Sequence, residues 1–119
     1  MDTARPRRAI DSLPEAIRAL PLVELPVAGA TGHCLHDDQK RVVFFAFDEG
    51  VSFPDHSHCE QRGLVIAGEM TIEIDGQTNL YQAGDTYVVP DGVRHRATFS
   101  KPTVLIDMSD APDRYSVYR

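Results

Sequence analysis

The sequence has no tryptophan, only two cysteines, and fewer basic than acidic residues. Cys34 and Cys59 are too few for a disulfide framework, and we expect both to be free thiols in a reducing compartment. Twelve Lys and Arg residues against eighteen Asp and Glu residues give a formal net charge of −6. This balance argues against nucleic acid and against an anionic membrane surface as partners, because both require a basic protein face.

Long apolar segments are missing as well. The longest apolar run, residues 42–47, is far too short to cross a bilayer. No apolar segment follows the basic start of the chain, so no secretory signal is visible and we expect a cytoplasmic protein. A chain of 119 residues has the usual size of a single domain with one core.

The N-terminal part of the chain predicts one short helix. Residues 12–15 read Ser-Leu-Pro-Glu, which is the pattern of a capping box with proline in the first turn. Leu13, Ile17 and Leu20 then share one helical face, and Pro21 ends the segment. We therefore expect a helical extension before the main domain.

The rest of the chain predicts β-structure. Short apolar or alternating runs are closed every eight to twelve residues by Pro, Gly, Asp or Lys-Pro, which is typical of a sandwich or a barrel. Asp75-Gly76 between two such runs indicates a hairpin. We expect an extension at 1–25 and a β-domain at 26–119, with runs at 42–47, 63–67, 70–74, 77–83, 86–89, 94–99 and 103–108.

His56-Ser57-His58 places two imidazoles two residues apart, and strand alternation directs both to the same face. Chelation of a metal ion from one strand requires this arrangement, because both nitrogens must converge on the ion. His33 and His36 lie away from this pair, and we expect them at the surface.

With its surroundings, the histidine pair resembles the first motif of the cupin family. Gly50 precedes His56 by five intervening residues, and Gly68 closes the motif. The second motif is matched by Gly84, five residues, Pro90-Asp91-Gly92, two residues and His95. The resemblance implies an all-β fold, a single cupin barrel of the jelly-roll or double-stranded β-helix type. It also implies one divalent transition metal ion, Zn, Ni, Mn or Fe, held by His56, His58 and His95.

The fourth ligand departs from the family pattern, which has Glu seven residues before the closing glycine. Gln61 occupies that position here, while Glu60 is the alternative, because alternation from His58 would direct Glu60 inward. We favour Gln61 on the spacing to Gly68. The residues in step with the site, Gly63, Val65 and Ala67, are small, which suits an interior that admits a substrate.

A set of three His and one Gln is neutral, which favours Lewis-acid chemistry and an anionic substrate. The chain resembles most closely the small cupins that linearise unsaturated uronates in pectin and alginate breakdown. That resemblance implies Asp107 as the proton-transfer residue, with Arg114 pairing the substrate carboxylate and Tyr115 beside it. Asp107 could also close a turn or pair with an arginine.

Three functions are therefore compatible with the sequence. The first is a metal-assisted lyase or isomerase of a small sugar acid. The second is a cupin dioxygenase acting on a small organic substrate, which Glu60 on the metal would favour. The third is a non-catalytic cupin that senses a small ligand. Similar cupins are commonly homodimers, and we expect the same here.

Overall fold

The computed structural model describes residues 8–57 and 59–110, which form two antiparallel β-sheets after a short helical segment. The five-stranded sheet has the order β1-β2-β9-β4-β7, and the four-stranded sheet has the order β3-β8-β5-β6. This confirms the all-β jelly-roll prediction. The elements are η1 (Ala9–Ser12), α1 (Glu15–Arg18), β1 (Ala30–His36), β2 (Arg41–Phe47), β3 (Ser52–His56), β4 (Gln61–Ala67), β5 (Glu69–Ile74), β6 (Gln77–Gln82), β7 (Thr86–Val89), β8 (His95–Thr98) and β9 (Thr103–Ser109).

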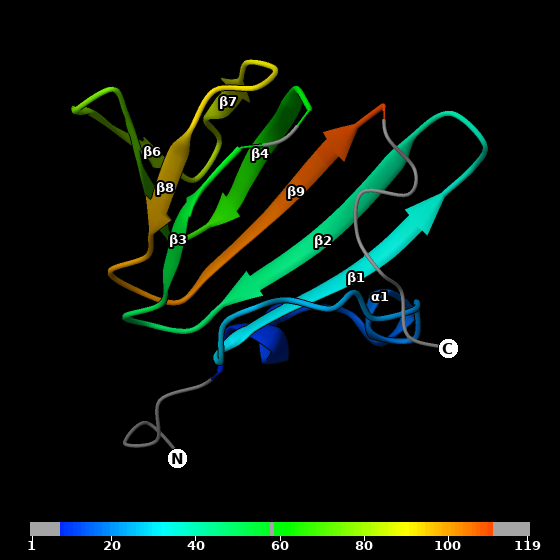
Figure 1. Cartoon of the computed structure of the whole chain (residues 1–119). Coiled ribbons are helices and arrows are strands. Elements are labelled where there is room, and N and C mark those ends of the chain that lie inside the picture. Colours follow the sequence, from blue (N-terminus) through cyan, green and yellow to red (C-terminus); the bar gives the residue numbers. More distant parts are fainter. Residues whose placement is uncertain (1–7, 58, 111–119) are drawn as a thin grey trace, which may run out of the picture.

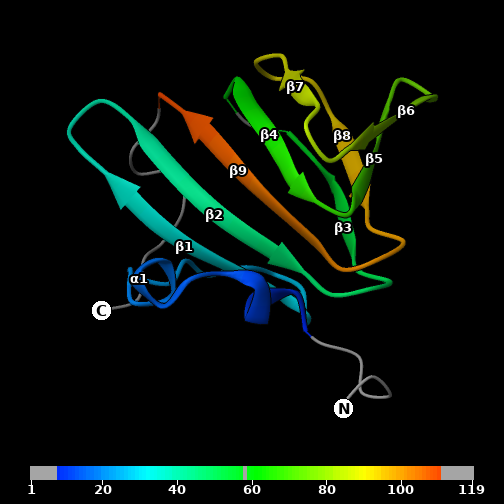
Figure 2. The ribbon, with the colours of Figure 1, turned by 180° about the vertical axis from the view of Figure 1, so that it is seen from behind.

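The two sheets face each other and enclose the core (Figures 1 and 2). They converge where the β2–β3 and β8–β9 connections run, and they lie further apart where β9 ends and the β7–β8 loop turns. We call these the narrow end and the wide end. β3 and β8 lie on one side of the interior and β2, β9 and β4 on the other.

Two strands, β1 and β3, do not correspond to any of the apolar or alternating runs predicted from the sequence. β1 contains Gly32 and two histidines, yet all seven of its residues pair in register with β2. β3 contains Pro54 and Asp55, residues that disfavour a central strand, and β3 is accordingly an edge strand with an irregular register. Long-range pairing therefore decided both strands, against their local preference.

The N-terminal helix begins later than predicted. Ser12 does not cap it, because residues 9–12 form a 3-10 turn in which the Asp11 carboxylate accepts a hydrogen bond from Arg8 N–H (3.2 Å). Leu13 is extended and buried, and α1 starts only after Pro14. Within the described residues, no helix is both long and apolar enough to cross a membrane.

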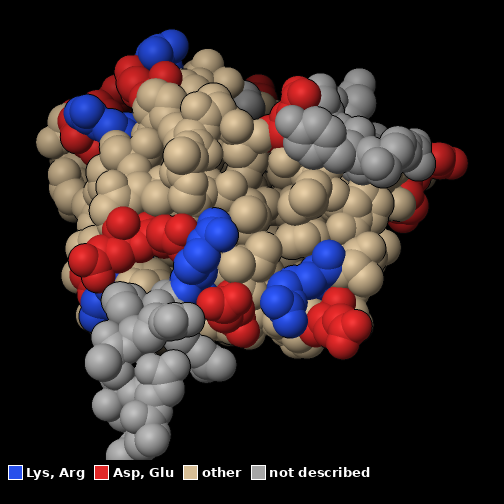
Figure 3. Space-filling model, turned by 90° about the horizontal axis from the view of Figure 1, so that it is seen from below, with Lys and Arg blue, Asp and Glu red and all other residues tan. Residues whose placement is uncertain are grey.

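The N-terminal segment covers part of the outer face of the five-stranded sheet. Ala9 and Leu13 form a small buried cluster with Ala46 of β2 and Val104 of β9. Leu13 is extended because it precedes Pro14, and the residue before a proline is disfavoured in the helical conformation. Seen from the side on which α1 lies, Lys and Arg alternate with Asp and Glu along the edges of a broad uncharged area (Figure 3).

Phenylalanines close the narrow end of the interior. Phe47 of β2 stacks on Phe99, which follows β8, with ring centroids 3.8 Å apart and an interplanar angle of 8°. The ring of Phe53, on β3, contacts the Phe47 ring edge-on with centroids 6.0 Å apart. The Phe45 ring stacks on Phe47 with centroids 5.4 Å apart. Because these rings come from both sheets, their contacts hold the sheets together at this end.

The chain crosses between the sheets at Gly68, the single residue between β4 and β5. Gly68 has a φ of +84°, and a Cβ there would overlap with the Pro102 carbonyl oxygen and with Thr103. Only glycine fits such a close approach. The Thr103 hydroxyl accepts a hydrogen bond from Glu69 N–H (3.1 Å) and lies 2.9 Å from the Glu69 carbonyl oxygen, which ties the crossing to β9.

We expect Leu105→Ala to lower the free energy of unfolding by about 3 kcal/mol, as for other buried leucines that leave a cavity. Leu105 is 2% exposed and pairs with Phe45 on one side and Val65 on the other. Urea unfolding measures the change. Leu80→Ala is the control, because Leu80 is 53% exposed and should change stability by less than about 0.5 kcal/mol. Equal losses in both variants would contradict this account of the core.

Candidate functional site

A pocket that opens to solvent lies between the two sheets, with a cavity volume of about 50 Å³. Its walls are mostly aromatic and aliphatic, and five polar side chains converge in it. A mainly apolar pocket with a few converging polar groups is the usual form of a small-molecule site. The polar side chains are those of His56, Gln61, Tyr87, His95 and Asp107.

His56 and His95 lie together although they are 39 positions apart in the sequence. They are directly paired across β3 and β8, and their ring centroids are 4.2 Å apart. Each Nδ1 lies against the carbonyl oxygen two residues upstream, Pro54 at 2.6 Å and Val93 at 3.0 Å. A carbonyl only accepts, so Nδ1 carries the hydrogen and, in the neutral ring, Nε2 carries the lone pair.

The irregular register of β3 is what brings His56 inward. Phe53 and His56 both line the pocket although three positions separate them, and the register with β8 shifts between them. Asp55 then lies outside, where its carboxylate forms an ion pair with Arg94 at 3.1 Å. Both partners are more than half exposed, so this pair contributes little stability by itself, although it links the two strands beside the histidines.

Gln61 and Glu60, the two candidates for a fourth ligand, have different environments. Gln61 starts β4 and lines the pocket, and its Oε1 is buried with no hydrogen-bond partner among the described residues. Glu60 is exposed and forms an ion pair with Arg62 at 3.2 Å. Alternation counted from His58 fails because residue 60 precedes β4 and is not part of a strand. The geometry therefore favours Gln61 over Glu60.

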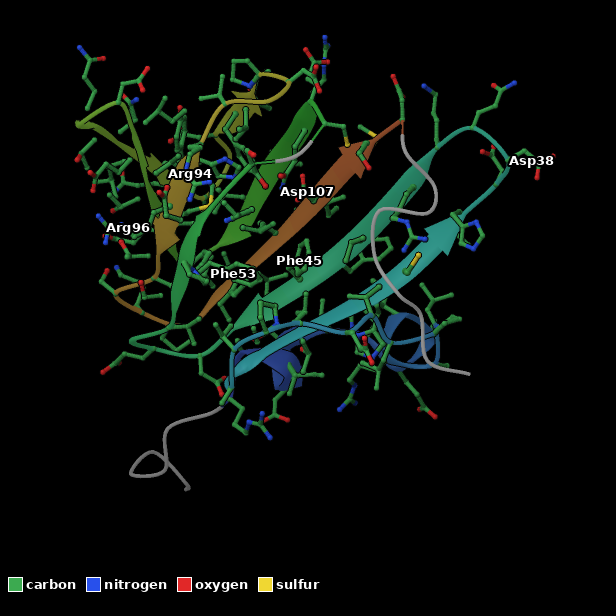
Figure 4. The ribbon with its side chains drawn as sticks, in the orientation of Figure 1. Asp38, Phe45, Phe53, Arg94, Arg96 and Asp107 are labelled. Atoms are coloured by element: carbon green, nitrogen blue, oxygen red, sulfur yellow. The ribbon has the colours of Figure 1, made fainter. Side chains whose placement is uncertain are left out.

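Asp107 lies inside β9 with its side chain in the pocket, and it is only 3% exposed. It shares this face with Leu105 and Ser109, both buried, as alternation along a strand requires. Its position within the strand rules out a role in closing a turn. Figure 4 shows Asp107 toward the space between the sheets, whereas Arg94 and Arg96 lie on the other side of that space, at β8.

Three predicted site residues, His58, Arg114 and Tyr115, lie outside the described residues. Within the described residues, no group of three His, Cys, Asp or Glu side chains is arranged to hold a metal ion. The two imidazoles and the amide oxygen of Gln61 nevertheless form a partial donor set on one pocket. Imidazole nitrogen with an oxygen donor suits a divalent transition metal. The orphaned Gln61 oxygen and the matching histidine tautomers thus fit such an ion.

His33 was expected at the surface, and this is wrong: it is 3% exposed. The segment before β1 lies alongside His33. Leu22 forms an isolated β-bridge with His33, and the N–H of Cys34 donates a hydrogen bond to the Pro21 carbonyl oxygen (2.8 Å). Burial, with a smaller contribution from the Arg18 charge, lowers the pKa of His33. His36, two residues on, is exposed as expected.

Two further polar residues inside the barrel were not predicted from the sequence. Tyr87 is 4% exposed and lines the pocket. Strand alternation could have predicted this, because Tyr87 and Val89 are two residues apart on β7 and therefore face inward together. Arg41 is 3% exposed at the start of β2, where its Nη1 lies 3.2 Å from Cys34 Sγ. Burial raises the pKa of the Cys34 thiol, and the Arg41 charge opposes this rise.

Comparison with known proteins agrees with this geometry. Residues 43–109 match the cupin domain family, so the chain belongs to that family, whose members usually bind a metal. KdgF from a Halomonas species is similar, with 26% identity and a TM-score of 0.68 over 76% of this chain and 87% of KdgF.

Two further solved structures have the same architecture. An RmlC-like cupin from Shewanella frigidimarina is 26% identical, with a TM-score of 0.67 over 86% of this chain and 87% of that one. A cupin superfamily protein from Desulfitobacterium hafniense is 22% identical, with a TM-score of 0.65 over 89% and 97% of the two chains, a likeness of fold. No curated protein matches the chain.

Proposed function

We propose that this cupin is a metal-dependent lyase or isomerase of a small sugar acid such as an unsaturated uronate. One observation carries the proposal: a buried carboxyl group, Asp107, shares a pocket with the donor atoms of His56, His95 and Gln61. A buried acid beside metal-ligand side chains is the arrangement needed for acid–base chemistry on a polarised substrate. The similarity to KdgF is in keeping with the resemblance that the sequence motifs indicate.

The ligands proposed for one divalent ion are His56, His58, Gln61 and His95. All four are neutral, so the ion would keep its full charge and act as a Lewis acid toward substrate oxygen atoms. The hydrogen bonds from Nδ1 to Pro54 O and Val93 O would hold the two described histidines in the ligating orientation. The exposed ion pair of Glu60 with Arg62 argues against an acidic ligand, and therefore against the dioxygenase alternative.

Asp107 is proposed to move the proton. Linearisation of an unsaturated uronate requires that the anomeric hydroxyl lose a proton, that the bond from this carbon to the ring oxygen break, and that a ring carbon of the double bond gain a proton. One carboxyl group can accept the first proton and deliver the second, so no outside acid is needed. Because the Asp107 side chain lies among apolar walls, water would compete poorly for either proton.

The substrate is proposed to be anionic, with Arg114 pairing its carboxylate and Tyr115 beside it. A guanidinium fork matches a carboxylate, which is why an arginine suits this role. The buried Cys34 thiol forms no disulfide, which is compatible with the cytoplasmic location that we propose.

A homodimer is proposed to form through the outer face of the five-stranded sheet. One row of outward residues crosses all five strands in register: Leu35, Val42, Met108, Arg62 and Val88. Leu35, Met108 and Val88 are 56%, 49% and 50% exposed. Phe44, Ile106 and Leu64, in the next row, are half-buried. Arg62 is the one charged residue in the first row, and an exposed apolar strip with a few polar residues beside it is typical of a protein interface.

The metal proposal predicts that Gln61→Ala weakens affinity for a divalent ion by about tenfold or more, because it removes a ligand oxygen. Glu60→Ala is the matched control and should leave the affinity unchanged. Competition titration against a metal-binding dye gives both values, and His95→Ala, measured alongside, should abolish binding at neutral pH. The reverse order of Gln61→Ala and Glu60→Ala would assign the role to Glu60 and favour the dioxygenase.

The mechanism predicts that Asp107→Asn lowers turnover of an unsaturated uronate by about a hundredfold or more, the usual cost of losing a general acid or base. Loss of the ultraviolet absorbance of the substrate's double bond reports the rate, and metal content should not change. Asp110→Asn is the control, because Asp110 is exposed and paired with Lys40 at 2.9 Å. Undiminished activity of Asp107→Asn would refute its role, and an inactive wild type would refute the substrate class.

The dimer proposal predicts that Leu35→Glu or Val88→Glu yields monomers, because each would bury an unpaired charge in the interface. Light scattering after size exclusion gives the mass in solution. Leu80→Glu on β6 is the control, since Leu80 is 53% exposed but belongs to the other sheet. A wild type that is monomeric at every concentration, or a Leu80→Glu protein that alone dissociates, would contradict the proposed face.

A further inference from the structure

Asp107 is part of an in-register row of inward positions that crosses the five-stranded sheet. On one side it pairs with Val43 of β2, and on the other with Gly63 of β4. Gly63 in turn pairs with Tyr87 of β7. Directly opposed residues of an antiparallel pair point to the same face, so Asp107 and Tyr87 face the same interior with only Gly63 between them.

The missing side chain of Gly63 is filled by the end of the Tyr87 ring. A Cβ built on Gly63 would overlap with Cζ, Cε1 and the hydroxyl oxygen of Tyr87. The phenol therefore extends from β7 across β4, and its hydroxyl end lies on the strand next to Asp107. Gly63 has no positive φ, so it is the space above this residue, and not its backbone conformation, that requires glycine.

The ring of Tyr87 has little room to adopt another position. It is 4% exposed and packs against Tyr81 of β6 with ring centroids 5.7 Å apart and an interplanar angle of 50°. The ring and Asp107 both line the pocket. A buried tyrosine whose hydroxyl end is directed to a polar position, rather than to solvent, brings a further hydrogen-bond donor and acceptor into a mostly apolar pocket wall.

We propose that Tyr87 is a second substrate-contacting residue, whose hydroxyl binds an oxygen of the sugar acid beside Asp107, and that Gly63 is glycine in order to admit that hydroxyl. This inference rests on the proposed function for its ligand class. A hydroxylated acid presents both donors and acceptors, and one phenolic hydroxyl can serve either. Its contribution is orientation: it fixes the sugar acid in the position where the Asp107 carboxyl can reach the proton to be moved.

The test is a double-mutant cycle of Tyr87→Phe and Gly63→Ala. Tyr87→Phe removes the hydroxyl and keeps the ring, whereas Gly63→Ala keeps the hydroxyl and displaces it with a methyl group. Each should weaken binding or turnover by about tenfold or more, as for a lost hydrogen bond to a charged or strongly polar ligand. The double variant should lose no more than the worse single variant, because both changes remove the same contact. Tyr81→Phe is the matched control and should behave as the wild type.

Two readouts separate this inference from the proposed function. The first is turnover of an unsaturated uronate, and the second is calorimetric binding of the saturated acids D-glucuronate and D-galacturonate to protein of measured metal content. Binding that Tyr87→Phe weakens, without turnover by the wild type, would uphold the Tyr87 contact and refute the activity. Turnover or binding unchanged in Tyr87→Phe would overturn the contact, as would a wild type that neither binds nor converts any of these uronates.

The thermal melting temperature distinguishes a ligand contact of Tyr87 from a purely structural role. Tyr87→Phe keeps the buried ring, so it should melt close to the wild type while losing affinity. If Gly63→Ala fails to fold, Tyr87→Phe and Tyr81→Phe still decide the proposal. Additive losses in the double variant would mean that Gly63 and Tyr87 act separately, and would overturn the assigned role of Gly63.

Discussion

The position of β9 is the constraint on which the rest of the structure depends. This strand comes last among the described strands, yet it lies in the middle of the five-stranded sheet, hydrogen-bonded to β2 on one side and β4 on the other. All seven residues of β9 pair with β2, so a shift by one residue would turn Asp107 outward and Met108 inward. The register of β9 therefore determines the core and the site together. Because the partner strands of β9 are distant in sequence, several long loops must close during folding before the contacts of β9 stabilise the barrel.

The kind of side chain that lines the interior changes along its length. At the narrow end, Phe47 and Phe99 stack and close the space between the sheets. Further along, the walls carry imidazole, amide, phenol and carboxyl groups, which cost stability when buried unless they find partners. The aromatic contacts offset that cost, so the barrel can hold a buried acid and an orphaned amide oxygen in one pocket. Sites that need strained or unsatisfied groups commonly depend on a rigid scaffold of this kind.

The two histidines show how local backbone geometry can prepare a ligand site. Each ring is held by the same contact, Nδ1 to the carbonyl oxygen two residues upstream, and each presents Nε2. The ion pair of Asp55 with Arg94 links the same two strands from outside. Orientation of the rings is thus set by the protein before any ligand is bound, and less entropy is lost when one binds.

The sequence alone determined the fold class, the hairpin at Asp75-Gly76, and the inward parity of Asp107, because these follow from alternation and turn chemistry within a few residues. The resemblance of the histidine motifs to those of the cupin family also implied that His56 and His95 would meet, as they do. Tertiary structure decided what local patterns cannot encode. Gln61 rather than Glu60 lines the pocket because residues 59 and 60 are not part of a strand. His33 is buried by a segment that pairs with it only in the folded chain. The phenol of Tyr87 lies over Gly63 because register, a property of two distant strands, sets them opposite each other.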